Sequence, residues 1–436
     1  MTAPTSTAPV STYQRLAERF RPVFAEIASG ATDREINRTL PFEQIRLLRD
    51  AGFGAVRVPE EYGGDGASAV DLFRLLIELA RADSNVAHIW RGHFAFLEVR
   101  LTHEDPEYRR HWGEQAVAGV VVGNAQSEPG SGAPTESNTV ITEKDDGTLV
   151  LNGEKYYSTG TIFSDWANVT ARYQDHHATI AVPLNAPGVT IHDDWVGFGQ
   201  RLTGTGTTAF SEVVVDSAHL TVYSPGARDR SYISGFYQLF LLAVVAGIGH
   251  AAVDDAADYV RSRTRPLLSG AAAQDDPLSQ AVLGRAAGAA FAAEAAVLHA
   301  AQRIDDAYRA ALDGVSEREP FEAADVAAYS AQIAVIPLVL SVTTDVFDVG
   351  GSSSVAQSRA LDRHWRNART IGVHNPIAAR QRAVGHRVLF DALPDPFAER
   401  EARESGADAV QDAASDDAAA AAADESATVS ESEGTA

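Results

Sequence analysis

Histidine side chains are the groups in this sequence best suited to acid–base chemistry, because an imidazole titrates near neutral pH. The chain has thirteen of them. His374 lies in the segment Val-His-Asn-Pro, and His93 lies in Trp-Arg-Gly-His-Phe, where helical spacing places it on one face with Ile89 and Leu97. Either imidazole could donate a hydrogen bond to an oxygen atom of a ligand. A surface or helix-capping histidine is the alternative for His374, and a satisfied core histidine is the alternative for His93.

An amide and a hydroxyl offer further hydrogen bonds. Asn124, in Val-Val-Gly-Asn-Ala-Gln, lies at the end of a predicted strand, and its side chain can both donate and accept. Ser158, in Tyr-Tyr-Ser-Thr-Gly, lies in a segment with strand periodicity, where Tyr157 and Thr159 fall on the opposite face. An asparagine in a turn and an ordinary strand serine are the alternatives. Asn124 and Ser158 are therefore candidate ligand-binding positions.

Several kinds of catalytic site are excluded by residues that the sequence lacks. With no cysteine, the chain has no thiolate nucleophile, no disulfide and no cysteine-ligated metal. His176 and His177 are adjacent, but their context predicts a hairpin turn, and we expect no metal site. The hydrolase motif Gly-x-Ser-x-Gly is absent, and so is a Gly-x-Gly-x-x-Gly motif between a strand and a helix. The glycines within 204–208 belong to a β-region, so they do not form a phosphate-binding loop.

The sulfur content of the chain is unusually low. There is no cysteine, and Met1 is the only methionine. Methionine is a useful filler of gaps in protein cores, so packing gives no reason to exclude it. Oxidation chemistry close to the protein would select against both residue types. Scarcity of sulfur in the cell when the protein is made would do the same, and drift in an alanine-rich genome is the alternative.

The composition of the chain limits where the protein could be located in the cell and what it could bind. The formal net charge is −23, which makes nucleic acid and anionic membranes poor partners. The N-terminus lacks the basic and apolar regions of a signal peptide, and the longest apolar run, 240–253, is shorter than a membrane span. Hydrophobic residues make up 45% of the chain, enough for a substantial core. We expect a cytoplasmic protein that binds neither nucleic acid nor membrane.

The hydrophobic period changes twice along the chain. Residues 13–116 and 225–396 have helical spacing, whereas residues 117–224 alternate with a period of two and predict seven or eight short strands. Residues 1–12 are predicted to be a disordered lead. Residues 397–436 are predicted to be a disordered acidic tail, because positions 401–436 hold ten acidic residues and one arginine. We therefore predict a helical domain, a β-domain, a second helical domain and a tail.

Five short motifs occur in an order and spacing that resemble those of the acyl-CoA dehydrogenase superfamily over about residues 12–395. They are Val-Pro-Glu-Glu-Tyr-Gly-Gly-Asp-Gly-Ala-Ser (58–68), Ser-Glu-Pro-Gly-Ser-Gly-Ala-Pro-Thr (127–135), Leu-Asn-Gly-Glu-Lys-Tyr-Tyr-Ser-Thr-Gly (151–160), Tyr-Val-Arg-Ser-Arg (259–263) and Phe-Asp-Val-Gly-Gly-Ser-Ser-Ser (347–354). The resemblance implies an α+β fold with an N-terminal helical domain, a central β-barrel and a C-terminal four-helix bundle. It also implies a homotetramer whose subunits complete one another's flavin sites.

The sequence departs from the dehydrogenases at the catalytic base, which is a carboxylate that removes a proton from the thioester. Residues 366–385 and 236–249, where that carboxylate would lie, contain no Asp or Glu. In the first of these stretches His374 takes its place. This substitution is similar to the flavin-dependent monooxygenase branch of the superfamily, which includes dibenzothiophene monooxygenase and its relatives in sulfur metabolism. The segments 198–210 and 155–161 are also similar to that branch.

The branch implies a specific chemistry. Reduced FMN arrives from a separate NAD(P)H-dependent flavin reductase, reacts with O2 and forms a C4a-(hydro)peroxide, which transfers oxygen to a soft atom. Together with the low sulfur content, this favours an organosulfur compound as the substrate and sulfur scavenging as the role. The outcome would be oxidation at sulfur or hydroxylation that leads to cleavage of the C–S bond.

The resemblance also implies roles for individual residues. The catalytic positions would be His374, His93, Asn124 and Ser158, with His374 stabilising or protonating the peroxide. The cofactor-binding positions would be Asn124, Ser127, Tyr157, Ser158, Thr159, Trp195, Arg263, Gly350, Gly351 and Arg369, with a further contact from Ser131. The two arginines would bind the FMN phosphate through charge-assisted bonds. Solvated arginines and a core tryptophan are the alternatives at those three positions.

Three other functions remain open at this stage. An FAD-dependent acyl-CoA dehydrogenase with an unrecognised base would retain FAD and bind CoA. A non-catalytic scaffold, or a partner that binds an acyl carrier, would show no flavin-dependent turnover. An enzyme that hydroxylates nitrogen or carbon in biosynthesis would share the flavin chemistry and differ only in its substrate.

Overall fold

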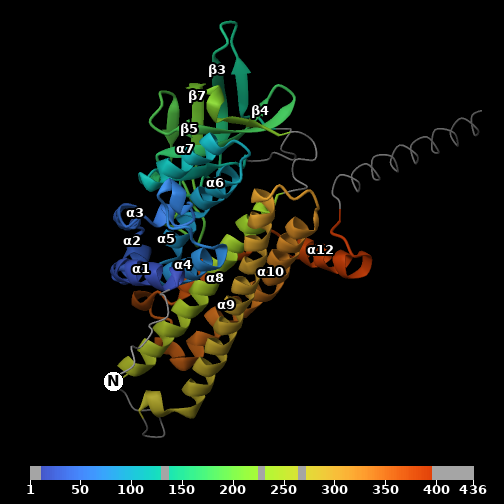
Figure 1. Cartoon of the computed structure of the whole chain (residues 1–436). Helices are drawn as coiled ribbons and strands as arrows, with labels where there is room; N and C mark the ends of the chain where they lie inside the picture. The colour runs from blue at the N-terminus through green and yellow to red at the C-terminus, as the bar shows by residue number, and fades with distance from the viewer. Residues whose placement is uncertain (1–10, 129–136, 224–230, 264–271, 395–436) are drawn as a thin grey trace, which may run out of the picture. The chain divides into compact units, whose positions relative to one another are not determined.

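The computed structural model describes residues 11–128, 137–223, 231–263 and 272–394. Within them helices come first, strands second and helices again third, which confirms the three-part plan expected from the sequence (Figure 1). The chain forms one compact unit over residues 1–381 and a second from Arg382 onward. Nearly all of the predicted lead and the whole of the predicted tail lie outside the described residues.

The N-terminal helices begin and end at residues that the sequence marks. They are α1 (Thr12–Ala28), α2 (Ala31–Asn37), α3 (Phe42–Asp50), α4 (Ala69–Ala82), α5 (Ser84–Ile89), α6 (Arg91–Leu101) and α7 (Pro106–Val117). Ser11 and Ser68 form capping boxes at the starts of α1 and α4. Gly52 follows α3 with a φ of 80°, a conformation that glycine adopts without strain. Asp83 caps α5 and thereby fixes the short link to α4.

The central strands form one eight-stranded sheet. They are β1 (Val122–Ala125), β2 (Val140–Glu143), β3 (Leu149–Lys155), β4 (Trp166–Tyr173), β5 (His176–Pro183), β6 (Val189–Ile191), β7 (Thr208–Val215) and β8 (Leu220–Val222). The order is β6-β7-β3-β2-β4-β5-β8, and β1 also pairs with β4. Both β1 and β2 run parallel to β4, whereas the remaining pairs are antiparallel.

One predicted strand is shorter than the sequence suggested. The alternation predicted that the strand containing Ser158 would continue to Gly160, but β3 ends at Lys155. Tyr157 has a φ of 59°, which no residue of a regular strand adopts. Tyr157, Ser158 and Thr159 therefore lie in a loop, and the expected division of their side chains between two strand faces does not apply.

Three of the five described C-terminal helices are long and apolar. The five are α8 (Ile233–Ser262), α9 (Pro277–Leu312), α10 (Glu319–Asp345), α11 (Asp362–Gly372) and α12 (Ile377–Phe390), and α8, α9 and α10 run side by side in Figure 1. These three are long and apolar enough to cross a membrane, by length and composition alone. In α8, however, 78% of that apolar window is buried inside the protein, so its hydrophobicity serves the core. In α9 only 22% is buried, which leaves an apolar face uncovered.

Aromatic packing fixes the turn between α5 and α6 against α8. Phe94 on α6 lies with its ring centroid 5.5 Å from that of Phe53 and 6.1 Å from that of Phe240 on α8. Trp90, at the turn itself, is fully buried and lies 5.3 Å from Phe53. Such ring pairs stabilise a core beyond the area that they bury. The residue after Trp90 is Arg91, which this packing holds over α8.

Candidate functional site

His374 lies in the link between α11 and α12, and neighbouring amide groups hold that link in place. Asn375 donates from Nδ2 to Oε1 of Gln238 on α8, at 2.5 Å. Gln332 on α10 donates from Nε2 to the carbonyl oxygen of Asn375, at 3.0 Å. His374 is exposed to solvent on one side. Two bundle helices thus position the histidine that the sequence singled out.

Arg91 is the nearest charged partner of His374. Its Nη1 donates to Nε2 of His374 at 3.1 Å, and its Nε donates to the carbonyl oxygen of Tyr237 at 3.1 Å. The guanidinium carbon lies 4.7 Å from the centre of the Tyr237 ring. We call Arg91, Tyr237, Gln238, His374 and Asn375 the His374 cluster. It joins the start of α6 to α8 and to the link after α11.

The contact with Arg91 determines how His374 can act. Because arginine only donates hydrogen bonds, Nε2 of His374 must accept, and the proton of the neutral ring is then on Nδ1. The surrounding protein and then the Arg91 charge lower the pKa of His374 to about 4. The imidazole is therefore neutral at pH 7, with an Nδ1–H group available to an oxygen atom.

His88 and Arg91 complete the electrostatics around His374. Nδ1 of His88 lies 3.0 Å from Oε1 of Gln200, an acceptor, so Nδ1 carries the proton. Burial and the Arg91 charge lower the pKa of His88 to about 3. Burial lowers the pKa of Arg91 to about 10, which leaves it cationic at neutral pH. Two neutral imidazoles and one cation thus lie close together, so the local field is positive.

Asn124 lies on β1, directly against the start of α6. A Cβ atom on Gly92 would lie 2.9 Å from the Cβ of Asn124, and one on Gly123 would lie 2.6 Å from the Cα of Thr161. Only glycine permits approaches this close. The carbonyl oxygen of Asn124 accepts from Oγ1 of Thr161 at 3.0 Å, while its side-chain amide has no protein partner among the described residues. The amide is therefore open to a ligand.

Ser158 lies in the loop after β3, and its hydroxyl has no protein partner within the described ranges. The residue is only 1% exposed, and its Oγ is a buried atom without a hydrogen bond. Its backbone N–H donates to the carbonyl oxygen of Gly206 at 3.0 Å. A Cβ on Gly160 would lie 2.6 Å from the carbonyl oxygen of Ile89, so this loop adjoins the α5–α6 turn. A buried hydroxyl of this kind calls for an explanation, and a bound ligand is one.

These two groups, which have no protein partner within the described residues, fit the edge of a flavin. The isoalloxazine ring presents carbonyl, imide and N5 positions along one edge, and the Ser158 hydroxyl and the Asn124 amide can bond to such atoms. Thr159 is less open, because its Oγ1 lies 2.7 Å from Oγ1 of Thr205. The structure thus brings Ser158, Asn124 and His374 towards the α5–α6 turn, from three separate parts of the sequence.

Aromatic side chains lie next to the Ser158 loop. The Tyr157 ring, half exposed, lies 4.6 Å from the Tyr156 ring and 6.0 Å from the Trp195 ring. Trp195 donates from Nε1 to the carbonyl oxygen of Gly199 at 3.2 Å. Ser127 is exposed, and its carbonyl oxygen accepts from the N–H of Tyr156 at 2.9 Å. Tyr157 and Trp195 could therefore form a wall for a planar ring, and Ser127 lies beside them. Ser131 lies outside the described residues.

His93 does not belong to this site. It is fully buried; its Nε2 lies 2.9 Å from the carbonyl oxygen of Gly54, and its Nδ1 accepts from the N–H of Val122 at 3.3 Å. Both ring nitrogens are therefore used by the backbone, and burial lowers the pKa of the ring to about 4. These contacts leave neither nitrogen for a ligand and argue against a catalytic role for His93. The alternative, a satisfied core histidine, is what the structure has.

Three of the predicted cofactor residues form a second group at the far end of α8. Nη1 of Arg263 donates to the carbonyl oxygen of Val349 at 3.0 Å, next to Gly350 and Gly351. A Cβ on Gly350 would lie 2.1 Å from the Tyr259 ring. Arg263 follows Tyr237 by 26 residues, which along a helix is about 39 Å. One FMN molecule cannot reach both groups within one chain.

Arg369 is exposed on α11 and has no ion pair within the described residues.

Sequence reasoning missed most of the His374 cluster. Arg91, Tyr237, Gln238 and Asn375 come from the starts of two helices and from a link, and only their folded positions bring them together. One signal was present: Asn375 follows His374 directly, and Gln238 interrupts an apolar run. A polar residue in such a run needs a partner.

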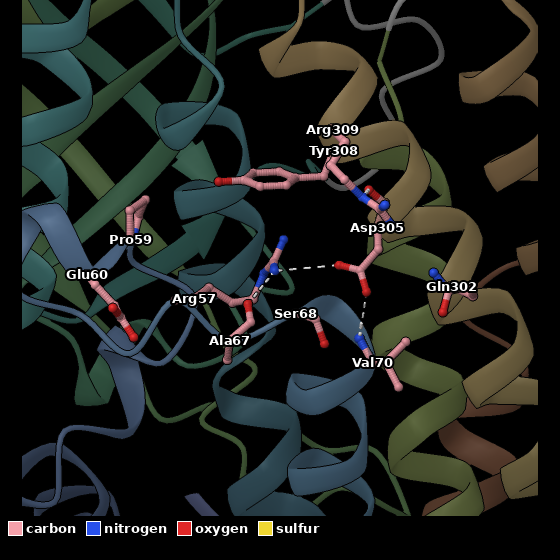
Figure 2. A pocket seen from close by; sticks show the side chains of 11 residues that line it. Arg57, Pro59, Glu60, Ala67, Ser68, Val70, Gln302, Asp305, Tyr308 and Arg309 are labelled. Atoms are coloured by element: carbon pink, nitrogen blue, oxygen red, sulfur yellow. Dashed lines mark hydrogen bonds and ion pairs between the residues drawn. The ribbon is translucent and has the colours of Figure 1, made fainter. Parts of the chain in front are cut away.

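A separate cavity of about 700 Å³ lies between residues 57–70 and α9. Figure 2 shows the Asp305 carboxylate between Arg57 and the N–H of Val70, 3.7 and 3.2 Å away. Arg57 also pairs with Glu98 at 2.6 Å. These buried charges are paired with one another, and none of the residues predicted from the sequence lines this cavity. Among the described residues no group of three or more His, Asp or Glu side chains could hold a metal ion.

Three domain models of the acyl-CoA dehydrogenase family match the chain. The N-terminal domain matches residues 12–119, the middle domain 123–213 and the C-terminal domain 239–378. Together they cover most of the chain, in the order in which the helices and strands occur.

Relatives and solved structures agree with this assignment. The "Probable FMNH2-dependent monooxygenase SfnC" of Pseudomonas putida is 29% identical, over 89% of this chain and 98% of its own length. The FMN-bound structure of TdsC, a dibenzothiophene monooxygenase from Paenibacillus sp. A11-2, is 27% identical with a TM-score of 0.79, over 88% of this chain and 99% of that chain. Methanesulfinate monooxygenase MsuC from Pseudomonas fluorescens is 28% identical with a TM-score of 0.78, over 89% and 99%. The chain belongs to the acyl-CoA dehydrogenase family, in its flavin-dependent monooxygenase branch.

Proposed function

We propose that this chain is the oxygenase of a two-component system, which uses FMNH2 from a separate NAD(P)H-dependent flavin reductase and O2 to oxidise an organosulfur compound. The observation that carries the proposal is His374. It replaces a carboxylate base, is neutral at pH 7 and bonds to Arg91 beside the α5–α6 turn, which the loop of Ser158 also adjoins. The Ser158 hydroxyl is buried and has no protein partner within the described ranges. A neutral imidazole is a poor base for a thioester α-proton but a good donor to oxygen. FAD as the cofactor is the alternative.

Two pairs of residues have different roles in this proposal: one pair binds the flavin, and the other places a proton. Bound reduced flavin supplies two electrons to O2, so that one oxygen atom adds to sulfur and the other leaves as water. Ser158 and Asn124 bond to the edge of the flavin ring. His374 offers its Nδ1 proton to the reacting oxygen, and Arg91 holds the ring in the tautomer that can do so.

The composition supports a role in sulfur scavenging. A chain whose only sulfur atom is in Met1 can be made when sulfur is scarce. An enzyme that oxidises organosulfur compounds is needed under the same condition. The oxidising chemistry of the site also selects against Cys and Met nearby.

We further propose a cytoplasmic homotetramer. The Arg263 group is too far from Tyr237 and the rest of the His374 cluster to serve the same flavin, so it would serve one held by a neighbouring subunit. The uncovered apolar face of α9, with Leu278 and Phe291 largely exposed, is suited to such contacts. Domain limits of 13–116, 117–224 and 225–396 are part of this proposal.

The test supplies photoreduced FMN and O2 to the purified protein, together with methanesulfinate or dibenzothiophene. The expected result is an oxidised sulfur product, formed roughly 100-fold more slowly by His374→Gln, because proton donation in the transition state is lost. His386→Gln, which changes a half-buried histidine on α12 whose Nδ1 lies 2.8 Å from the carbonyl oxygen of Ala392, is the matched control and should leave the rate unchanged. Retention of FAD that an acyl-CoA bleaches, with no sulfur product, would mean that the protein is a dehydrogenase.

A further inference from the structure

Arg91 has no carboxylate partner in the described part of the chain. Two of its five N–H groups bond to His374 and to the carbonyl oxygen of Tyr237, and neither partner is charged. Some buried or half-buried arginines, such as Arg34, Arg57 and Arg363, pair with a carboxylate, and Arg91 does not. A half-buried cation without a counter-ion is less favourable than a paired one, and a bound anion would supply the missing charge.

Arg91 also differs from Arg100, a fully buried arginine that has no ion pair among the described residues. Arg100 is 2% exposed, and its guanidinium carbon lies 4.3 Å from the centre of the Phe96 ring, so it is sealed inside the core. Arg91 is only half buried, and its Nη2 carries no protein bond within the described ranges. Its free N–H groups can therefore reach a ligand beside His374.

The surroundings of Arg91 favour an anion over a neutral ligand. The titratable side chains beside Arg91 are His88, His374 and Tyr237. The two histidines carry no negative charge, and burial raises the pKa of Tyr237, so this phenol is neutral at pH 7. Asn375 and Gln238 are occupied with each other. A planar guanidinium matches the two oxygens of an oxyanion in a bidentate arrangement.

We propose that Arg91 binds the sulfur oxyanion of the substrate, so that the natural substrate is an alkanesulfinate or a related organosulfur anion. This inference rests on the proposed function and narrows its substrate class. A sulfinate whose two oxygens contact Arg91 leaves the lone pair on sulfur free. Arg91 also bonds to His374, so that sulfur would lie near the histidine that serves the reacting oxygen.

The phosphate of FMN has the same oxyanion chemistry, and a binding experiment separates the two sources. Calorimetry measures the affinity of the wild-type protein, Arg91→Gln and Arg91→Lys for methanesulfonate, an inert analogue, and for FMN and riboflavin. Arg110→Gln, which changes an exposed arginine on α7, is the control. Melting temperatures establish that every variant is folded.

We expect Arg91→Gln to weaken methanesulfonate binding at least tenfold while leaving the affinity for FMN within twofold. The affinity of Arg91→Lys for methanesulfonate should lie between those of the wild-type protein and Arg91→Gln. Lysine keeps the positive charge but cannot form the bidentate contact of a guanidinium. A loss of FMN affinity without a loss of riboflavin affinity would instead assign Arg91 to the phosphate. No methanesulfonate binding by the wild-type protein, or equal binding by Arg91→Gln, would overturn the inference. If the wild-type protein did not bind methanesulfonate but still oxidised dibenzothiophene with FMNH2, the inferred substrate class would be rejected and the proposed function would stand.

Discussion

His374 acts through the tautomer that Arg91 imposes. Because its pKa is lowered to about 4, the ring is already neutral at pH 6, where an ordinary histidine would be largely protonated. The groups that face it are Arg91 and His88, and neither turns negative. We predict that the oxidation rate stays constant from pH 8 down to about 5 and falls only as the pH approaches 4. A rate that halves near pH 6.5 would show that the ring titrates normally. His374→Gln should remove the acid limb.

Substituting Ser158 and Ser164 separates an effect on flavin binding from an effect on protein stability. The Ser158 hydroxyl has no protein partner in the described structure, whereas that of Ser164 donates to the carbonyl oxygen of Gly160 at 2.9 Å. Ser158→Ala should leave the melting temperature nearly unchanged and weaken FMN binding about tenfold, the value of one hydrogen bond. Ser164→Ala should lower stability by about 1 kcal/mol and leave FMN affinity unchanged. The opposite pattern would place the flavin elsewhere.

Single residues show how far sequence reasoning reaches. His374 drew attention because it replaces an expected carboxylate, and its role stays a prediction. For His93, a helical face shows which way a ring points but not that both its nitrogens bond to the backbone. Arg91 was missed because arginine is common on solvated surfaces, and nothing in the sequence shows that this one lacks a carboxylate.

Close contacts between the elements position the site. Gly92, at the start of α6, allows β1 to approach, and Ala at this position would place Cβ 2.9 Å from the Asn124 Cβ. We predict that Gly92→Ala costs about 1–3 kcal/mol of stability and lowers activity, because Asn124 and Arg91 move apart. Gly284→Ala, on α9 with nothing within 4 Å, is the control, and it should stabilise by about 0.5–1 kcal/mol. Thermal unfolding measures both, and equal effects would contradict this account.

Most helices and strands could be predicted from the spacing of hydrophobic residues along the chain. The elements that could not be predicted have local causes. The sequence predicted seven or eight short strands within residues 117–224, and the described part of that range has eight, because alternation is strong where one face is buried. β8, with three residues, is too short to show a period. The strand β3 ended early because Tyr157 takes a positive φ, which no propensity of tyrosine predicts. That early end creates the loop that carries Ser158.

The whole molecule must be an oligomer if Arg263 binds the same flavin as Ser158. Mixing Arg263→Ala with His374→Ala subunits, each inactive alone, should then restore activity. In a random mixture about a quarter of the sites would combine an intact His374 from one chain with an intact Arg263 from another. The recovered rate after subunit exchange measures this fraction. No recovery, with exchange shown by light scattering and labelled subunits, would mean that each chain holds its flavin alone.

The most direct test of the central claim follows an oxygen atom. Photoreduced FMN and methanesulfinate are mixed with ¹⁸O₂ and the purified protein, and the product is analysed by mass spectrometry. The account predicts methanesulfonate with one ¹⁸O atom, formed together with water and oxidised FMN, and much less of it with His374→Gln. Unlabelled product, or consumption of O2 to hydrogen peroxide alone with every sulfur compound tried, would contradict it.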